Sequence, residues 1–242
     1  MGDADSSSEE PESAPRFTTR HLRADVDLDA CARRIVREMY QRRDTKRNYS
    51  ASAGFALSSR LIGDIATAHS ELVTPGPAAF PTPTDLSIEE QHVYRAAAIG
   101  YRTAFPEPFV LAPLADDWET TDPETGYRWV ASTPLAGIDE SGQHRIRHVA
   151  IGRGAADLDA PTYFMLALRT DGWADEVLID PAALLDADRR DPLRIDAEVR
   201  AEARAWAGTR AEALIALGPD PRPRMGRDCL GCAYVAKCTV HR

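Results

Sequence analysis

The 242-residue chain lacks any apolar run long enough to span a membrane, and its first twelve residues are acidic rather than a basic and then apolar leader. It has only four cysteines, no internal repeat and no glycine-rich phosphate loop. These absences predict a soluble, cytoplasmic protein. Because thiols stay reduced in the cytoplasm, clustered cysteines there indicate metal ligands before disulfides.

The chain also lacks the charge of a globally basic nucleic-acid binder, since its formal net charge is −9. The charge is uneven: Met1–Glu12 carries five acids and no base, whereas Arg16–Arg60 carries eleven bases against five acids. Further bases follow near the C-terminus: Arg222, Arg224, Arg227, Lys237 and Arg242. The two basic segments could form a patch that follows a phosphate backbone, or they could be solvated helix faces without a ligand.

The four cysteines are split between the two ends of the chain. Cys31 stands alone, whereas Cys229, Cys232 and Cys238 form a C-x2-C-x5-C array in the last fourteen residues. Four thiolates are what one zinc ion or one iron–sulfur cluster needs. A site built from all four would join the N-terminal helix to the C-terminus as a structural clasp. Four unrelated buried cysteines are the alternative.

Hydrophobic periodicity and turn residues predict a mixed α/β domain with helices packed on a small central sheet. Residues 1–16 are expected to be a disordered acidic tail, and 17–242 a single domain with a cysteine module at about 219–242. Helices are expected at about 28–43, 53–72, 88–103, 160–169 and 196–217. Strands are expected at about 108–114, 127–134, 145–151 and 176–180.

Local signals support several of these elements. Ser87 and Glu90 have the spacing of a capping box, and Asp159 is a candidate cap for the helix that follows it. The DESG run between the second and third strands indicates a hairpin turn. Apolar residues recur along one face of the first helix: Leu28, Cys31, Ile35 and Met39. Cys31 is therefore expected to face the core.

This element order, with one early cysteine and a distant C-x2-C-x5-C array, resembles the RecB/AddB-type nucleases of the PD-(D/E)XK superfamily and their CRISPR-associated relatives. The resemblance covers about residue 25 to the C-terminus. It implies a restriction-endonuclease-like core whose ends are stapled by a [4Fe-4S] cluster on four ligands: Cys31, Cys229, Cys232 and Cys238. Zinc is the alternative metal, held by all four cysteines or by three of them with His241.

The resemblance also implies a catalytic pattern that this sequence does not match. The family uses two carboxylates to hold Mg²⁺ or Mn²⁺ and a nearby lysine to assist the attacking water. Here the second carboxylate falls on Ala150 and the lysine on Gly152. The strand that should supply the first carboxylate has no acid before Asp139, which we interpret as a turn residue. We therefore expect no catalytic residues.

The leading hypothesis is a catalytically degenerate iron–sulfur nuclease-like protein that binds nucleic acid, a protein partner or both, as a subunit of a DNA-processing or defence complex. The candidate phosphate contacts are five arginines near the first helix: Arg33, Arg34, Arg37, Arg42 and Arg43. One alternative is an active Mg²⁺- or Mn²⁺-dependent DNA exonuclease with migrated acids: Glu107, Asp116, Asp117 or Asp139. The other alternative is a zinc-binding interaction module.

Overall fold

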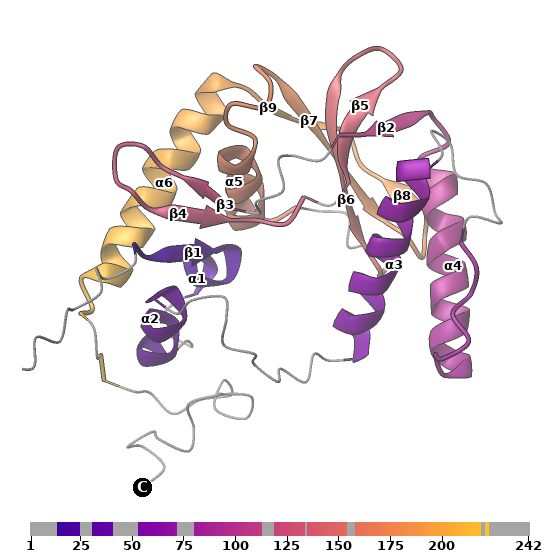
Figure 1. The fold of residues 1–242 in the computed structure, drawn as a ribbon, viewed down its shortest axis with the longest axis horizontal. Coiled ribbons are helices and arrows are strands. Elements are labelled where there is room, and N and C mark those ends of the chain that lie inside the picture. Colours follow the sequence, from indigo (N-terminus) through magenta and orange to yellow (C-terminus); the bar gives the residue numbers. More distant parts are fainter. Residues whose placement is uncertain are drawn as a thin grey trace, which may run out of the picture.

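The fold is mixed α/β, with helices on both faces of a multi-stranded sheet (Figure 1). The computed structural model describes residues 14–24, 31–40, 53–71, 80–112, 119–133, 135–153, 158–218 and 221–222. This architecture confirms the fold class that the sequence predicts. Among the described residues, none of the helices combines the length and the apolar character that crossing a bilayer would require.

Six helices and nine strands make up the described part of the chain. The helices are α1 (Thr19–Arg23), α2 (Ala32–Tyr40), α3 (Ala53–Glu71), α4 (Ile88–Ala104), α5 (Ala160–Arg169) and α6 (Ala197–Ile215). The strands are β1 (Arg16–Thr18), β2 (Phe109–Leu111), β3 (Glu119–Thr121), β4 (Arg128–Val130), β5 (Ala136–Asp139), β6 (His144–Ala150), β7 (Val177–Ala183), β8 (Asp188–Arg189) and β9 (Leu193–Ile195).

The larger sheet has the strand order β2-β5-β6-β7-β8, and β9 also pairs with β7. Strands β2, β5 and β6 form an antiparallel meander, in which Ile138 lies opposite His144. The chain then crosses through α5 and returns as β7, which runs parallel to β6 with Ile146 beside Ile179. A parallel pair needs such a crossover because a hairpin turn cannot join strands of the same direction.

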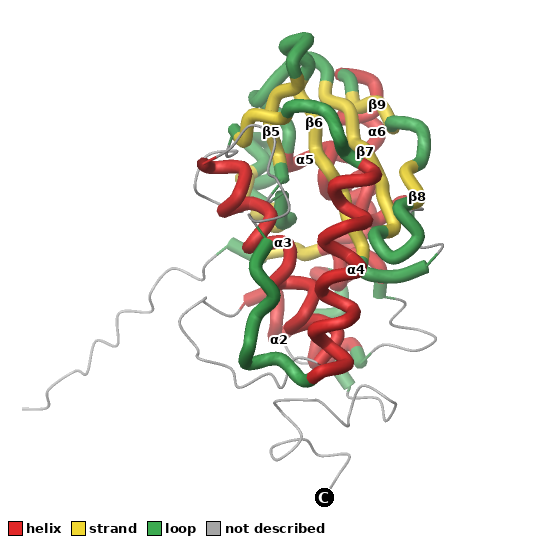
Figure 2. The backbone as a smooth tube through the Cα atoms, turned by 90° about the vertical axis from the view of Figure 1, so that its right-hand side faces the viewer, coloured by secondary structure: helices red, strands yellow, loops and turns green. Residues whose placement is uncertain are grey.

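Helices cover both faces of the larger sheet. In Figure 2, α3 and α4 stand in front of the strands, whereas α5 and α6 lie behind them. Each face has its own hydrophobic cluster: Ile146 belongs to the one on the α5/α6 side, and Val149 belongs to the one on the α3/α4 side. Because successive side chains of a strand alternate between faces, β6 contributes to both clusters.

Helix α4 is fixed at its start by a cap and in its middle by close packing. The Ser87 side chain accepts from the Glu90 N–H, and the Glu90 carboxylate accepts from the Ser87 N–H at 3.0 Å, which confirms the predicted capping box. At Gly100, a Cβ atom would lie 1.6 Å from the Leu184 carbonyl oxygen. Only glycine lets the helix approach the end of β7 this closely.

The helices on the other face begin at aspartate caps. The Asp159 carboxylate accepts from the Thr162 N–H at 3.0 Å, as the sequence predicts for α5. At the start of α6, the Asp196 side chain accepts from the first-turn N–H groups of Glu198 and Val199, each at 3.1 Å. These bonds satisfy backbone donors that have no partner inside the helix.

The structure differs from the prediction at the second strand. The 127–134 segment is not part of the central meander, because β4 pairs with β1 and β3 in a separate three-stranded sheet. The middle strand of the meander is β5, which the sequence did not predict, and it ends at Asp139. The carbonyl oxygens of Ala14 and Pro15 accept hydrogen bonds from Arg128 of β4.

Candidate functional site

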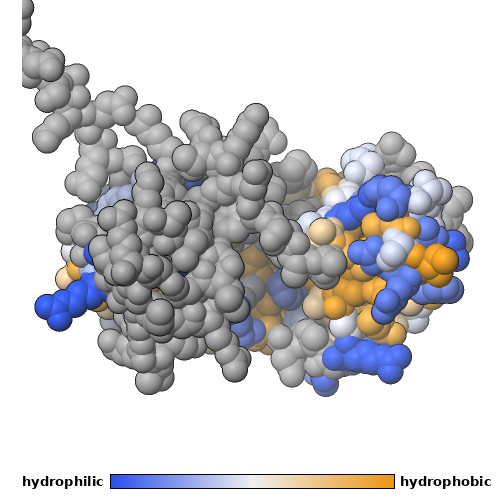
Figure 3. Space-filling view, turned by 90° about the horizontal axis from the view of Figure 1, so that it is seen from below, coloured by the Kyte–Doolittle hydropathy of each residue, from blue (hydrophilic) through white to orange (hydrophobic). Residues whose placement is uncertain are grey.

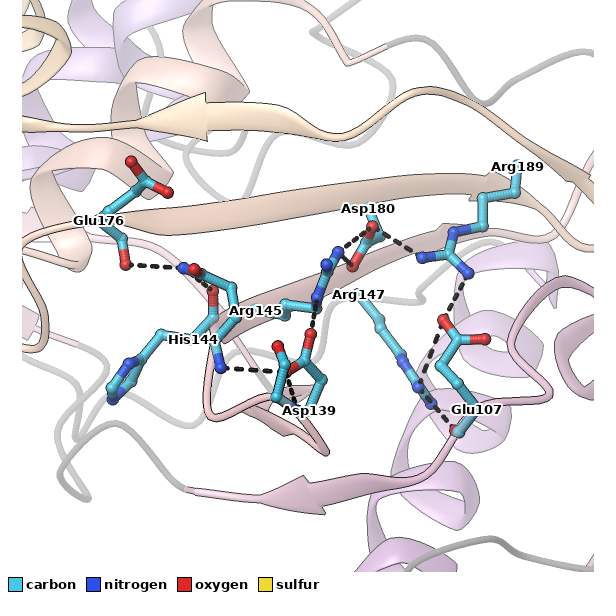
Figure 4. Close-up of polar contacts among 10 residues, drawn as sticks. Glu107, Asp139, His144, Arg145, Arg147, Glu176, Asp180 and Arg189 are labelled. Carbon is cyan, nitrogen blue, oxygen red and sulfur yellow. Dashed lines mark hydrogen bonds and ion pairs between the residues drawn. The ribbon is translucent and has the colours of Figure 1, made fainter.

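Alternating acids and arginines cross the larger sheet on the face that α3 and α4 cover (Figure 4). We call this row the charge chain: Asp139, Arg145, Asp180, Arg189, Glu107 and Arg147. Its members come from β5, β6, β7, β8 and the loop between α4 and β2. Three carboxylates thus face three guanidinium groups, and their formal charges cancel.

Asp180 is the centre of the charge chain and is only 1% exposed. Its carboxylate accepts from Arg145 Nη1 at 3.0 and 3.2 Å, and from Arg189 Nη2 at 3.0 Å. Arg189 also donates to the Glu107 carboxylate and to the Ala104 carbonyl oxygen. Two arginines therefore share one buried carboxylate, which compensates charges that would be costly alone.

Arg147 ends the charge chain inside a cage of aromatic rings and is 3% exposed. Its guanidinium carbon lies 4.1 Å from the centroid of the Phe109 ring and 4.8 Å from that of Phe105. Its nitrogens donate to the Tyr101 hydroxyl at 2.9 Å and to the Glu107 carbonyl oxygen at 3.2 Å. Stacking and hydrogen bonds together stabilise a cation that water cannot reach.

Asp139 closes the β5–β6 turn and also belongs to the charge chain. Its carboxylate accepts from Arg145 Nε at 2.6 Å and from the backbone N–H groups of Ser141 and Gln143 at 2.9 and 3.0 Å. Burial alone would raise the pKa of Asp139, but these hydrogen bonds lower it to about 2. It is thus a strand-ending carboxylate as well as the turn residue that the sequence predicts.

The carboxylates of the charge chain are committed to arginines rather than open to a divalent ion. A Mg²⁺ or Mn²⁺ site needs several oxygen ligands with spare coordination. Within the described ranges, no group of three or more histidine, cysteine, aspartate or glutamate side chains is arranged to hold a metal. Two acids considered as migrated catalytic residues, Asp116 and Asp117, lie outside the described residues.

The position that the resemblance assigns to the second carboxylate, Ala150, lies on the face of β6 opposite the charge chain. Ala150 shares a face of β6 with Ile146, which packs on the α5/α6 side. The charge chain lies on the other face, where β6 presents Arg145, Arg147 and Val149. Ala150 therefore does not share a face of β6 with the charge chain, and the β6 residues on the charge-chain face are two arginines and a valine.

The turn end of the charge chain borders an open hollow of about 570 Å³. His144 and Trp173 meet there edge to face, with 4.9 Å between their ring centroids. Glu176 on the rim pairs with Arg194 at 2.6 Å, and Arg200 donates to the backbone carbonyl oxygens of Asp175 and Ala174. Glu176 and Arg200 are thus engaged by other groups of the protein, and the charge chain is the better-defined feature.

Cys31 lies directly before α2, and its carbonyl oxygen accepts the first helical bond from the Ile35 N–H at 3.1 Å. Cys31 is half-buried, and it forms no disulfide with any residue that the structure describes. Two residues later, Arg33 Nε donates to the Pro221 carbonyl oxygen at 3.0 Å. The start of α2 therefore lies beside the segment that leads to the cysteine array. The other three cysteines and His241 lie outside the described residues.

The predicted phosphate-contacting arginines do not share one environment. Arg34 is 7% exposed and donates to the Glu38 carboxylate at 3.0 Å, so its role is structural and we remove it from the candidate surface. Burial alone would raise the pKa of Glu38, but hydrogen bonds from His21 and Arg34 and the charge of Arg20 lower it to about 2. The remaining candidates are Arg33 and Arg37, which are half-buried, and Arg42 and Arg43, which lie outside the described residues.

The sequence did not reveal Asp180 and Arg189 as members of a site. One signal was present, because Asp180 interrupts the apolar run of β7, where an unpaired acid would be costly. Its partners come from other strands, and the sequence alone does not show which arginines lie beside it. No protein-family model matches the chain, and no curated protein matches it significantly.

Proposed function

We propose that this protein is a catalytically degenerate, nuclease-like scaffold whose ends are held together by a metal cluster and which binds nucleic acid. The element order supports the resemblance: a helix, a three-stranded meander, a crossover helix and a strand parallel to the last meander strand. The role is one of binding rather than hydrolysis, in association with other subunits of a DNA-processing or defence complex.

The charge chain is the observation that carries this proposal. The nuclease chemistry of the resembled family requires carboxylates that bind a divalent ion. In this chain, the acids on the corresponding face accept from arginines, and Arg147 and Val149 occupy β6. A guanidinium group supplies positive charge to the carboxylates, but unlike a metal ion it cannot lower the pKa of a bound water.

The contact between Arg33 and Pro221 supports the metal clasp. It holds Cys31 near a segment from which Cys229 is eight residues away along the chain. Four thiolates fit the donor set of a [4Fe-4S] cluster, and they also fit zinc. Bound to Cys31 and the C-terminal array, either group would supply folding free energy by joining two distant parts of the chain.

Nucleic-acid binding is supported by the charge of the α1–α2 region. Residues 14–24 and 31–40 contain six arginines and a single acid, Glu38, which is buried against Arg34 and His21. Glu119 pairs with Arg16 and Asp159 with Arg23, so Arg33 and Arg37 on α2 are the arginines that carry the proposal. In Figure 1, α2 lies near the lower end of α6, and Arg33 of α2 contacts Pro221, the residue before exposed Arg222. A surface with this charge attracts a phosphate backbone without reading its sequence.

Anaerobic purification followed by visible absorption and iron, sulfide and zinc analysis tests the clasp. We expect a brown protein with about four iron atoms per chain. Cys31→Ser and Cys229→Ser should each lose the chromophore and become protease-sensitive. A colourless protein with one zinc ion per chain would show that the clasp binds zinc instead of an iron–sulfur cluster. Cysteine variants that retain full stability would contradict the clasp altogether.

Fluorescence polarisation with labelled DNA and RNA oligonucleotides tests the binding role. The variant Arg33→Gln/Arg37→Gln should weaken binding by about tenfold and reduce its salt dependence. Arg204→Gln/Arg210→Gln removes the same charge from exposed positions of α6 and serves as the matched control. Equal losses in both variants would show that binding reflects overall charge, and unchanged binding in both would exclude the α2 surface.

A further inference from the structure

Helix α4 presents an outward stripe that mixes isoleucine with basic residues. Its members are spaced by four, three, four and three positions: Ile88, His92, Arg95, Ile99 and Arg102. Ile88 is 77% exposed and Ile99 is 63% exposed, the highest values for large apolar side chains in the described part of the chain. This spacing places the five residues on one face of the helix. The opposite face packs into the core through Tyr94 and Tyr101.

A hollow of about 180 Å³ lies against this stripe. Five residues line it: Phe80, Arg95, Ala98, Ile99 and Arg102. The lining is mostly apolar, and the guanidinium groups of Arg95 and Arg102 flank it. Seen from below in Figure 3, apolar and strongly polar surface alternate on the right-hand side, over the α3–α4 part of the molecule. The hollow has room for one apolar side chain with charged neighbours.

The two arginines are placed to bind anions beside that side chain. Arg95 Nε donates to Thr82 Oγ1 at 2.8 Å, which holds the side chain in place and leaves its two terminal nitrogens as donors. None of the described residues forms an ion pair or hydrogen bond with the Arg102 guanidinium. Guanidinium groups of this kind bind carboxylates through two parallel hydrogen bonds.

We propose that the α4 stripe is the docking surface for an acidic amphipathic helix of a partner protein. One apolar residue of that helix would fill the hollow, and carboxylates beside it would pair with Arg95 and Arg102. Helix recognition uses anchors at the spacing that α4 itself presents. The charge complementarity determines the class of partner, since a basic helix would meet like charges.

This surface lies on α4, on the opposite side of the larger sheet from α5 and α6, and it does not depend on the metal clasp or on nucleic-acid binding. A second copy of this chain is a poor occupant, because an antiparallel pairing of two stripes about Arg95 would bring two Arg95 guanidinium groups together. A partner of opposite charge avoids that repulsion and buries both isoleucines.

Fluorescence polarisation with three labelled peptides of about 16 residues tests the proposal, each long enough for about four helical turns. One peptide is amphipathic with glutamate and leucine, one replaces every glutamate by lysine, and one replaces every leucine by serine. We expect the glutamate–leucine peptide to bind at least about tenfold more tightly than the other two.

Charge-reversal variants locate the binding. The variant Arg95→Glu/Arg102→Glu should bind the glutamate–leucine peptide about tenfold or more less tightly than the unchanged protein does. It should bind the lysine–leucine peptide more tightly. Arg204→Glu/Arg210→Glu on α6 changes the net charge equally and should alter neither affinity. Ile99→Ser should lower the affinity for the glutamate–leucine peptide without changing the net charge. Circular dichroism checks that this exposed-site variant keeps its fold.

Several results would overturn the proposal. If the glutamate–serine peptide bound as tightly as the glutamate–leucine peptide, binding would be simple charge attraction. The same conclusion would follow if the α6 control variant lost as much affinity as Arg95→Glu/Arg102→Glu. No binding by any peptide would exclude the helix partner. Self-association that Ile99→Ser abolishes in sedimentation would assign the stripe to a second copy. The oligonucleotide assay tests the α2 surface separately. Nucleic-acid binding by α2 and helix docking on α4 can therefore be rejected independently of each other.

Discussion

The two faces of the larger sheet differ in how they are held together. The α5/α6 face is mainly apolar, with Ile146 from β6 and Ile179 from β7 side by side, and it also bears His148. The α3/α4 face carries the charge chain, centred on Asp180. A sheet covered by helices on both faces is usually apolar on both. Charges on one face therefore mark a place where something other than packing has shaped the sequence.

The charged face also bears a strand-ending carboxylate of the kind that the proposed resemblance expects. Asp139 ends a meander strand, as the first catalytic carboxylate would, but Arg145 and two backbone N–H groups occupy it. On the proposed resemblance, arginines stand beside these carboxylates where the resembled family has a metal ion. Such a face would keep its buried charges balanced while it loses the ability to activate water.

Removing the central acid should have the largest effect on stability. Asp180→Ala leaves Arg145 and Arg189 without their shared buried carboxylate, and we expect the free energy of unfolding to fall by about 4 kcal/mol. Urea denaturation measures this change. Asp180→Asn keeps the shape and part of the hydrogen bonding, so it should cost less. A loss below about 1 kcal/mol for Asp180→Ala would show that the charge chain is dispensable.

A cavity on the apolar face should have a slightly smaller effect. Ile179→Ala removes a fully buried side chain beside Asp180 on the same strand, and it should cost about 3 kcal/mol. The two variants differ in their response to salt. Added salt should change the loss of unfolding free energy caused by Asp180→Ala but leave the loss caused by Ile179→Ala unchanged. The same salt dependence in both variants would contradict the distinction between the two faces.

Protonation of Asp139, on the charged face, should have the smallest effect. The pKa of Asp139 is about 2 in the folded chain, below its ordinary value of 3.8. Its contribution is therefore complete above about pH 4 and is lost as the pH falls toward 2. Asp139→Asn should remove about 1–2 kcal/mol at neutral pH and flatten the acid limb of the stability curve. Ile179→Ala should keep the slope of that limb, and a flattened limb in this variant would contradict the assignment.

The sequence predicted the elements whose signals are local. The Ser87–Glu90 box and the Asp159 cap each lie within one helical turn of the bonds they form. The small sheet was missed because β1 and β3 have three residues each, too few for periodicity to register.

The charge chain could not be predicted for a different reason. Glu107 and Arg189 are 82 residues apart in the chain, and only the fold shows that they meet. The face of β6 that bears the charge chain could not be predicted for the same reason. Which face of a strand bears the site depends on what packs against each side, so a one-residue slip is invisible in the sequence.

A nuclease assay tests the central claim most directly. Cluster-loaded protein is incubated anaerobically with single- and double-stranded DNA in Mg²⁺ and in Mn²⁺, in the same samples whose binding is followed by polarisation. The account predicts that the DNA is bound and remains intact. Cleavage that a chelator stops, and that Asp139→Asn or Asp180→Asn abolishes, would show instead that the carboxylates of the charge chain still hold a catalytic metal.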